Sequence, residues 1–254
     1  MKKVLLPLPS YGFDPTEAAI PWKILTDQGR DVAFATPTGS IPEPDISMLT
    51  GARLGILKPI LRAKQTAIDA FHKMEKSEAF KNPIRYQDMN ASNFDGLLLS
   101  GGHDKRIKEY LESPLVQNTI VSFFNEQKPV GAICHGVIAV ARSIDPNTGK
   151  SVLHGRKTTA LLKSQELLAY NLTRLWLKDY YLTYPGLTVE DEVKSVLSDP
   201  NNFFEGPKPI LRDDLDHLNR AFVVQDNNYL SARWPGDAHK FSLEFSKMLN
   251  STIS

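Results

Sequence analysis

Residues 128–141 constrain the fold more than any other part of the chain. The first half of this segment is short and apolar and follows Pro129, which is typical of a buried strand, and the second half is rich in Ala, Val and Ile at helical spacing. Cys134, the only cysteine of the protein, lies between the two halves. A sharp strand-to-helix turn lifts a side chain out of the sheet toward a helix N-terminus, so Cys134 lies where a nucleophile belongs.

Apolar strands alternate with amphipathic helices along the first half of the chain. The expected strands are residues 4–8, 31–37 and 94–100, and the expected helices are residues 17–29 and 115–126. This alternation predicts an α/β fold built on a doubly wound, mostly parallel sheet with helices on both faces.

Residues 171–212 differ in composition from the rest of the chain. Aromatic side chains are interleaved there with prolines, and the segment is too aromatic to be a disordered linker. We therefore expect a packed helical insertion, called the cap segment below, within a single domain of residues 1–254. After it, residues 221–232 predict a hairpin with an asparagine-rich turn, and residues 235–249 predict a C-terminal helix.

The composition excludes several classes of protein. A formal net charge of +1 over 254 residues provides no basic face for nucleic acid or for a membrane surface. No stretch approaches the roughly 20 apolar residues of a membrane span. One cysteine excludes an internal disulfide and a multi-cysteine metal site. We expect a soluble, cytoplasmic protein that binds neither a metal nor a cofactor.

Two interpretations of Cys134 stay open from the residues alone. A reactive thiol needs a lowered pKa, which a helix N-terminus or a neighbouring cation supplies. The alternative is a small buried apolar residue, since unpaired cysteines are commonly buried. His135 follows directly, and adjacent side chains of a strand point apart, so it can act as a base toward Cys134 only if a turn separates them.

Further candidates follow other strands of the predicted sheet. Glu17 comes just after the first strand and its loop, and Gly101, Gly102 and His103 follow a later strand. The carboxyl ends of parallel strands meet at one edge of a sheet, so these residues are expected near Cys134. Glu17 either serves the thiol or stabilises a helix's first turn. The glycines let backbone N–H groups approach an oxyanion, and His103 either faces the site or is an exposed loop residue.

Three motifs taken together resemble a known family. They are Glu17-Ala18-Ala19-Ile20-Pro21, Ser100-Gly101-Gly102-His103-Asp104 and Ala132-Ile133-Cys134-His135-Gly136. Their order is similar to that of the ThiJ/PfpI superfamily, which implies the class I glutamine amidotransferase-like fold, a flavodoxin-like arrangement. The chain looks closest to the larger-subunit branch, which includes heat-shock chaperones with glyoxalase III activity and intracellular proteases or amidases. The resemblance also implies a homodimer.

The resemblance assigns a role to each matching residue. It makes Cys134 the nucleophile and Glu17 the carboxylate that hydrogen-bonds to the thiol. It makes His135 the general base, and Gly102 with the His135 amide would form an oxyanion hole.

In the family, the acid of the catalytic triad follows a short strand that comes after the helix next to the nucleophilic cysteine. Residues 155–160 look like that strand, and Glu166 is the nearest acid downstream. The chain departs from the family pattern at Trp234, which stands before Pro235 where asparagine is common.

Two classes of function stay open. In the first, the chain is a cysteine-dependent enzyme that acts on a small carbonyl or amide, either as a glyoxalase III-like lyase or as an amidase or peptidase. In the second, it is a stress-response chaperone that holds unfolded protein clients, or a redox sensor that works through oxidation of Cys134. The cap segment fits either a lid or a client-binding surface.

Overall fold

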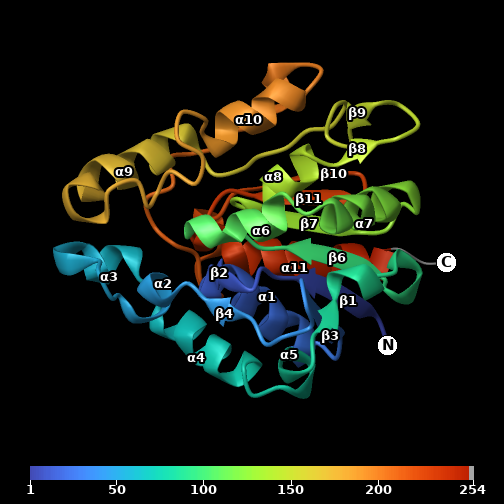
Figure 1. The fold of residues 1–254 in the computed structure, drawn as a ribbon, viewed down its shortest axis with the longest axis horizontal. Helices are drawn as coiled ribbons and strands as arrows, with labels where there is room; N and C mark the ends of the chain where they lie inside the picture. Colours follow the sequence, from blue (N-terminus) through green and yellow to red (C-terminus); the bar gives the residue numbers. More distant parts are fainter. Residues whose placement is uncertain (252–254) are drawn as a thin grey trace.

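The computed structural model describes residues 1–251, and a seven-stranded sheet forms the centre of that part of the chain (Figure 1). The strand order is β10-β11-β7-β6-β1-β3-β5, and the neighbouring strands are parallel except for β10 and β11. The strands are β1 (Lys3–Pro7), β3 (Asp31–Thr36), β5 (Ile84–Arg85), β6 (Gly96–Leu99), β7 (Val130–Ile133), β10 (Val223–Asp226) and β11 (Tyr229–Ala232). Small sheets pair β2 (Tyr11–Phe13) with β4 (Glu43–Pro44) and β8 (Ile144–Asp145) with β9 (Lys150–Ser151). The predicted mostly parallel α/β fold is confirmed.

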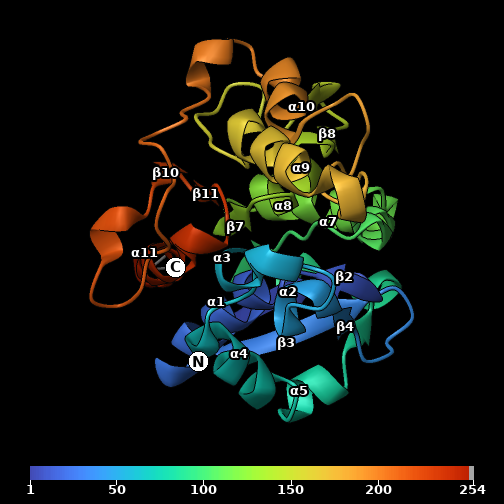
Figure 2. The same ribbon diagram turned by 90° about the vertical axis from the view of Figure 1, so that its left-hand side faces the viewer.

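Helices lie on both faces of this sheet. The helices are α1 (Pro15–Asp27), α2 (Ile46–Thr50), α3 (Lys58–Leu61), α4 (Gln65–Met74), α5 (Glu78–Lys81), α6 (Lys108–Leu111), α7 (Pro114–Asn125), α8 (Gly136–Ala141), α9 (Lys163–Leu177), α10 (Val189–Val196) and α11 (Ala238–Ser251). α1 and α11 pack side by side on one face, and α7 and α8 lie on the other (Figure 1 and Figure 2). The strand order reverses between β1 and β6, which is where such sheets form their sites.

The start of α1 follows from its sequence. Asp14 Oδ1 accepts hydrogen bonds from the N–H groups of Thr16 and Glu17, at 2.8 and 3.2 Å. Pro15 occupies the first helical position, where an N–H would have no partner within the helix. This cap fixes Glu17 in the first turn of α1, beside the carboxyl end of β1.

The strand expected at residues 155–160 does not form. Within this range, one isolated bridge joins Thr158 to Phe203. Two side chains of β11 bond to this segment instead: Thr158 Oγ1 lies 3.1 Å from the Tyr229 hydroxyl, and the Thr159 N–H donates to Ser231 Oγ. The segment therefore crosses the sheet edge as a loop.

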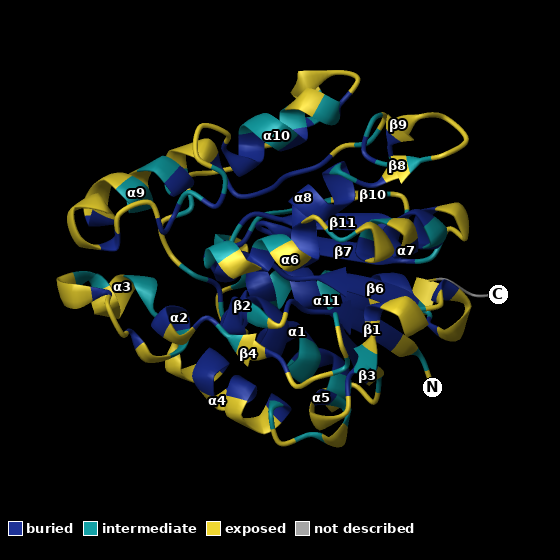
Figure 3. Ribbon diagram, viewed as in Figure 1, coloured by how far each residue is buried: buried dark blue, intermediate teal, exposed yellow. Residues whose placement is uncertain are grey.

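The cap segment packs over α8 at one side of the molecule (Figure 1 and Figure 2). A small buried cluster joins it to α2 and the loop that follows; its members are Met48, Leu54, Leu177, Tyr180 and Tyr181. Figure 3 shows the sheet as buried and much of α9 as exposed. Among residues 1–251, no helix is both long and apolar enough to cross a membrane.

Candidate active site

Cys134 lies at the turn between β7 and α8 with a backbone φ of +58°. Residues other than glycine rarely adopt this left-handed conformation, and residues strained in this way concentrate at active sites. The turn is tight, since a Cβ on Gly136 would lie 2.4 Å from the carbonyl oxygen of Leu99. The predicted strand-turn-helix arrangement around Cys134 is confirmed.

The Glu17 carboxyl group is buried beside the Cys134 side chain. Its Oε2 accepts a 2.7 Å hydrogen bond from the Gly101 N–H, while Oε1 has no nitrogen or oxygen partner among residues 1–251. Burial and the nearby Asp14 carboxylate raise the pKa of Glu17 well above its usual range. Burial and Glu17 likewise raise the pKa of the Cys134 thiol. The two acids therefore titrate as a coupled pair, and each holds its proton more tightly than the same group does in water.

This geometry corrects the expectation of a thiol with a lowered pKa. The His135 N–H at the start of α8 does hydrogen-bond to the sulfur and favours the thiolate, but burial and the acidic neighbours outweigh it. Cys134 is 1% exposed. A thiolate can therefore form here when a neighbouring base takes the proton.

His135 reaches the thiol although it is the next residue in the chain. Its Nδ1 lies 3.4 Å from Cys134 Sγ, because the positive φ at Cys134 turns the backbone between the two side chains. Burial and the neighbouring His103 lower the pKa of His135 well below its usual range. The imidazole is thus neutral at neutral pH and able to accept the thiol proton.

A threonine contacts the other ring nitrogen of His135. Thr183 Oγ1, in the cap segment, lies 3.0 Å from His135 Nε2. Glu166, expected as the triad acid, instead accepts a 3.0 Å hydrogen bond from the Val189 N–H at the start of α10. The expected role of Glu166 is therefore corrected, because α9 directs this carboxyl group to α10, and a hydroxyl occupies the place beside the imidazole.

Gly101 and Gly102 bring the backbone after β6 into the site. A Cβ on Gly101 would lie 2.6 Å from His135 N and 2.9 Å from Glu17 Oε2. A Cβ on Gly102 would lie 2.2 Å from the carbonyl oxygen of Gly12. Both positions therefore exclude a side chain, and this close approach allows the hydrogen bond between Gly101 and Glu17.

His103 lies inside the site, so the alternative of an exposed loop residue is wrong. Its side chain is 9% exposed, and its ring centroid lies 5.0 Å from that of His135 and 4.8 Å from that of Tyr181. Burial lowers the pKa of His103 to about 4. Its Nδ1 has no hydrogen-bond partner among residues 1–251.

The cap segment brings to this site side chains that the sequence motifs did not predict. Thr183 contacts His135, Tyr181 packs against His103, and the charge of Arg212 acts on both Asp14 and Glu17. The aromatic composition of the cap segment indicated that it is packed, but it did not indicate which of its side chains reach the site. Within residues 1–251, no group of three or more His, Cys, Asp and Glu side chains is arranged to hold a metal ion.

Comparison with known proteins identifies relatives of this chain. A family model described as ThiJ/PfpI family-like matches residues 8–199. The chain is 25% identical to glyoxalase 3 of Candida albicans over 170 residues, which cover 63% of this chain and 68% of that protein. It is 27% identical to C14C4.04 of Schizosaccharomyces pombe, whose function is uncharacterised, over 149 residues. That match covers 56% of this chain and about half, 54%, of the relative's length.

Solved structures share the fold. The crystal structure of glyoxalase III from Candida albicans has a TM-score of 0.72 at 21% identity and covers 97% of both chains. Drosophila melanogaster DJ-1beta has a TM-score of 0.56 at 16% identity and covers 98% of this chain and 94% of that one. With the family model matching most of the sequence and the same fold in these structures, the chain belongs to the ThiJ/PfpI-like family.

Proposed function

We propose that the chain is a cysteine-dependent enzyme of the glyoxalase III type, which converts a small 2-oxoaldehyde into a 2-hydroxy acid without glutathione. The observation that carries this proposal is the 3.4 Å approach of His135 Nδ1 to Cys134 Sγ, with the buried Glu17 carboxyl group beside the same sulfur. The similarity to glyoxalase 3 of Candida albicans supports the choice of substrate class.

The reaction needs a nucleophile and groups that move protons, and the site has both. His135 takes the thiol proton, Cys134 Sγ bonds to the aldehyde carbon of R–CO–CHO, and the proton goes to the aldehyde oxygen to give a hemithioacetal. His135 or Glu17 then removes the C1 proton, and an enediol forms. Reprotonation at C2 gives the thioester of the 2-hydroxy acid, an isomer of the hemithioacetal. Water hydrolyses the thioester and returns the thiol, so no external oxidant or reductant is required.

Lactate formation from methylglyoxal tests this proposal. We expect the wild-type protein to form lactate without glutathione and Cys134→Ser to lose activity by at least about a thousandfold, because the nucleophile is gone. Retention of the activity in Cys134→Ser, or its absence in wild type, would overturn the proposal. Hydrolysis of amide substrates in place of methylglyoxal would indicate the amidase alternative.

The chaperone and redox-sensor alternatives predict different results for the wild-type protein and Cys134→Ser. Suppression of client aggregation that persists in Cys134→Ser, without lactate formation, would indicate a chaperone. Conversion of Cys134 to sulfinic acid by peroxide, without lactate formation, would indicate a redox sensor. We also propose a homodimer, and a monomer mass by light scattering would overturn that assignment.

A further inference from the structure

Arg212 supplies a cation to the buried site. Its Nη2 donates a 3.1 Å hydrogen bond to the Leu61 carbonyl oxygen, and its Cζ lies 5.7 Å from the Trp234 ring centroid. Within residues 1–251, no carboxylate lies at ion-pair distance from this guanidinium group. Its charge nevertheless reaches Asp14 and Glu17. The Leu61 carbonyl oxygen is the one hydrogen-bond acceptor of Arg212 among residues 1–251, which leaves most of its five N–H donors without a protein partner there.

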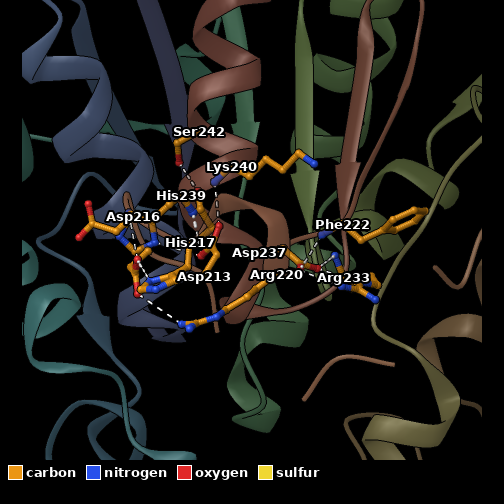
Figure 4. Close-up of polar contacts among 12 residues, drawn as sticks. Asp213, Asp216, His217, Arg220, Phe222, Arg233, Asp237, His239, Lys240 and Ser242 are labelled. Carbon is orange, nitrogen blue, oxygen red and sulfur yellow. Dashed lines mark hydrogen bonds and ion pairs between the residues drawn. The ribbon is translucent and has the colours of Figure 1, made fainter. Parts of the chain in front are cut away.

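The residue that follows Arg212 is held in place by the start of α11. The Asp213 N–H donates a 2.7 Å hydrogen bond to the Gly236 carbonyl oxygen. The Asp213 carboxylate accepts hydrogen bonds from the N–H groups of His239 and Lys240, at 3.3 and 2.8 Å, and lies 3.0 Å from His239 Nδ1 (Figure 4). Arg212 thus extends from an anchored backbone rather than from a loose loop.

A buried ion pair anchors the segment around Arg233 in the same way. Arg233 Nε lies 2.9 Å from Asp237 Oδ2, and both side chains are almost completely buried. Asp237 Oδ1 also accepts a 3.0 Å hydrogen bond from the Phe222 N–H (Figure 4). Arg233 Nη1 donates to the carbonyl oxygens of Glu205 and Pro207. These bonds fasten the chain before Arg212, at Glu205 and Pro207, and after it, at Phe222.

Buried polar atoms without partners lie near this cation and in the adjoining site. The Tyr181 hydroxyl, on a side chain that is 3% exposed, has no hydrogen-bond partner among residues 1–251, and neither has His103 Nδ1 or Trp234 Nε1. Buried polar groups are normally hydrogen-bonded, so the unpartnered Tyr181 hydroxyl and Trp234 indole N–H near a cation indicate a missing ligand. Tyr181 lies within the electrostatic range of Arg212 and against the His103 ring. A hydroxyl, an indole N–H and a guanidinium group together are suited to an anion.

Arg212 has a second possible role, as a counter-ion for Asp14 and Glu17. Burial raises the pKa of both carboxyl groups despite the presence of Arg212. Among residues 1–251, no ion pair joins the guanidinium group to either carboxyl group, and arginine stays charged at neutral pH. The positive charge is therefore left for a ligand.

We propose that Arg212, with Tyr181, binds an anionic group of the substrate, so that the enzyme prefers 2-oxoaldehydes carrying a carboxylate at the end remote from the aldehyde. This inference rests on the proposed glyoxalase III-type function and names its substrate class. With 4,5-dioxopentanoate, the aldehyde carbon bonds to Cys134 Sγ and the carboxylate lies against Arg212. Addition of one water yields 2-hydroxyglutarate and a proton, by the same internal proton transfer and thioester hydrolysis as above.

Paired substrates test the preference. The kcat/KM for 4,5-dioxopentanoate is compared with that for 2-oxohexanal, a neutral aldehyde of similar length, in wild type, Arg212→Met, Arg212→Lys and Arg174→Met. We expect wild type to favour the anionic substrate and Arg212→Met to lower this ratio by about tenfold or more, since a charged hydrogen-bonded pair is lost. Arg212→Lys keeps the charge and most of the ratio, and Arg174→Met, on the exposed surface of α9, keeps all of it.

The outcomes separate the two proposals. Turnover of both aldehydes with a ratio that Arg212→Met leaves unchanged overturns the anion site and leaves the glyoxalase function standing. Failure of wild type to convert either aldehyde overturns both. If Arg212→Met does not fold, Tyr181→Phe serves instead, because it removes one hydroxyl at constant shape and is expected to lower the ratio about threefold. The anion site is also overturned if folded Tyr181→Phe leaves the ratio of the two kcat/KM values unchanged and neither Arg212→Met nor Arg212→Lys lowers it.

Discussion

The Glu17 carboxyl group and the Gly101 N–H are joined by a 2.7 Å hydrogen bond that connects the first turn of α1 to the end of β6. This bond uses Oε2 and leaves Oε1 free of nitrogen and oxygen partners among residues 1–251. The carboxyl group is consequently held in one orientation beside the Cys134 sulfur, where each acid affects the titration of the other.

Glu17→Gln tests this coupling. Glu17 is one of the groups that raise the pKa of the Cys134 thiol, so its replacement by an uncharged amide is expected to lower that pKa. The variant is also expected to lose about tenfold to a hundredfold in kcat, because it can no longer carry a proton. Ultraviolet thiolate absorbance, followed against pH, measures the shift. Glu78→Gln, at an exposed position of α5, is the matched control, and an unshifted midpoint in Glu17→Gln contradicts the coupling.

Glu166 is expected to make stability depend on pH. Burial raises the pKa of Glu166 to about 7. An unfolded glutamate titrates at about 4.3, so the folded state binds this proton more tightly. The stabilisation is complete below about pH 4 and is lost as the pH rises through about 7, which amounts to about 4 kcal/mol.

Denaturant unfolding of wild type and Glu166→Gln at about pH 5 and about pH 8 measures this effect. The wild-type free energy of unfolding is expected to fall more between the two pH values than that of Glu166→Gln. The glutamine oxygen can still accept the hydrogen bond from the Val189 N–H, so it preserves the contact and removes the titration. Equal pH dependence in the two proteins would show that Glu166 does not take up a proton on folding.

Thr183→Val is expected to impair activity more than it impairs folding. The substitution keeps the shape of the side chain but removes the hydroxyl that lies 3.0 Å from His135 Nε2. Loss of one buried hydrogen bond costs about 1–3 kcal/mol of stability, and an imidazole free to change its tautomer lowers kcat by about tenfold. Thr183→Ser retains the hydroxyl and should retain most of the activity. Thermal unfolding and kcat in the three proteins give the comparison.

Gly102→Ala is expected to destabilise the fold. The added Cβ would lie 2.2 Å from the carbonyl oxygen of Gly12, and backbone atoms cannot move aside as a flexible side chain can. We expect a loss of about 2 kcal/mol or more in the free energy of unfolding. Gly155→Ala is the control, because its Cβ meets no atom within 4 Å. Equal stability of the two variants would be evidence against the close approach at Gly102.

The sequence was sufficient to predict the arrangement of Glu17, Gly101 and Cys134. Each follows a strand of a parallel sheet, and the carboxyl ends of such strands meet at one edge, so local pattern and topology together place them. Thr183 and Arg212 could not be predicted in this way. Their positions depend on the path of the cap segment, which is fixed by tertiary contacts such as the ion pair between Arg233 and Asp237.

The same distinction explains the error at Glu166. A search for the nearest acid along the chain assumes that distance in sequence reflects distance in space. α9 begins just before Glu166 and carries its carboxyl group to the N-terminus of α10, where a helix start offers an unpaired N–H. Glu166 therefore accepts a hydrogen bond from the start of α10, and the hydroxyl of Thr183, further along the chain, contacts the His135 imidazole.

The left-handed backbone conformation at Cys134 lowers the stability of the fold and at the same time presents the reactive sulfur. A side chain at φ +58° costs roughly 1 kcal/mol, and glycine adopts this conformation without strain. Cys134→Gly would therefore relax the elbow while abolishing the chemistry, and substitutions selected for thermal resistance alone would tend to erase the nucleophile. Any directed evolution of this scaffold must select for turnover together with heat tolerance, because the strain that weakens the fold is what presents the sulfur.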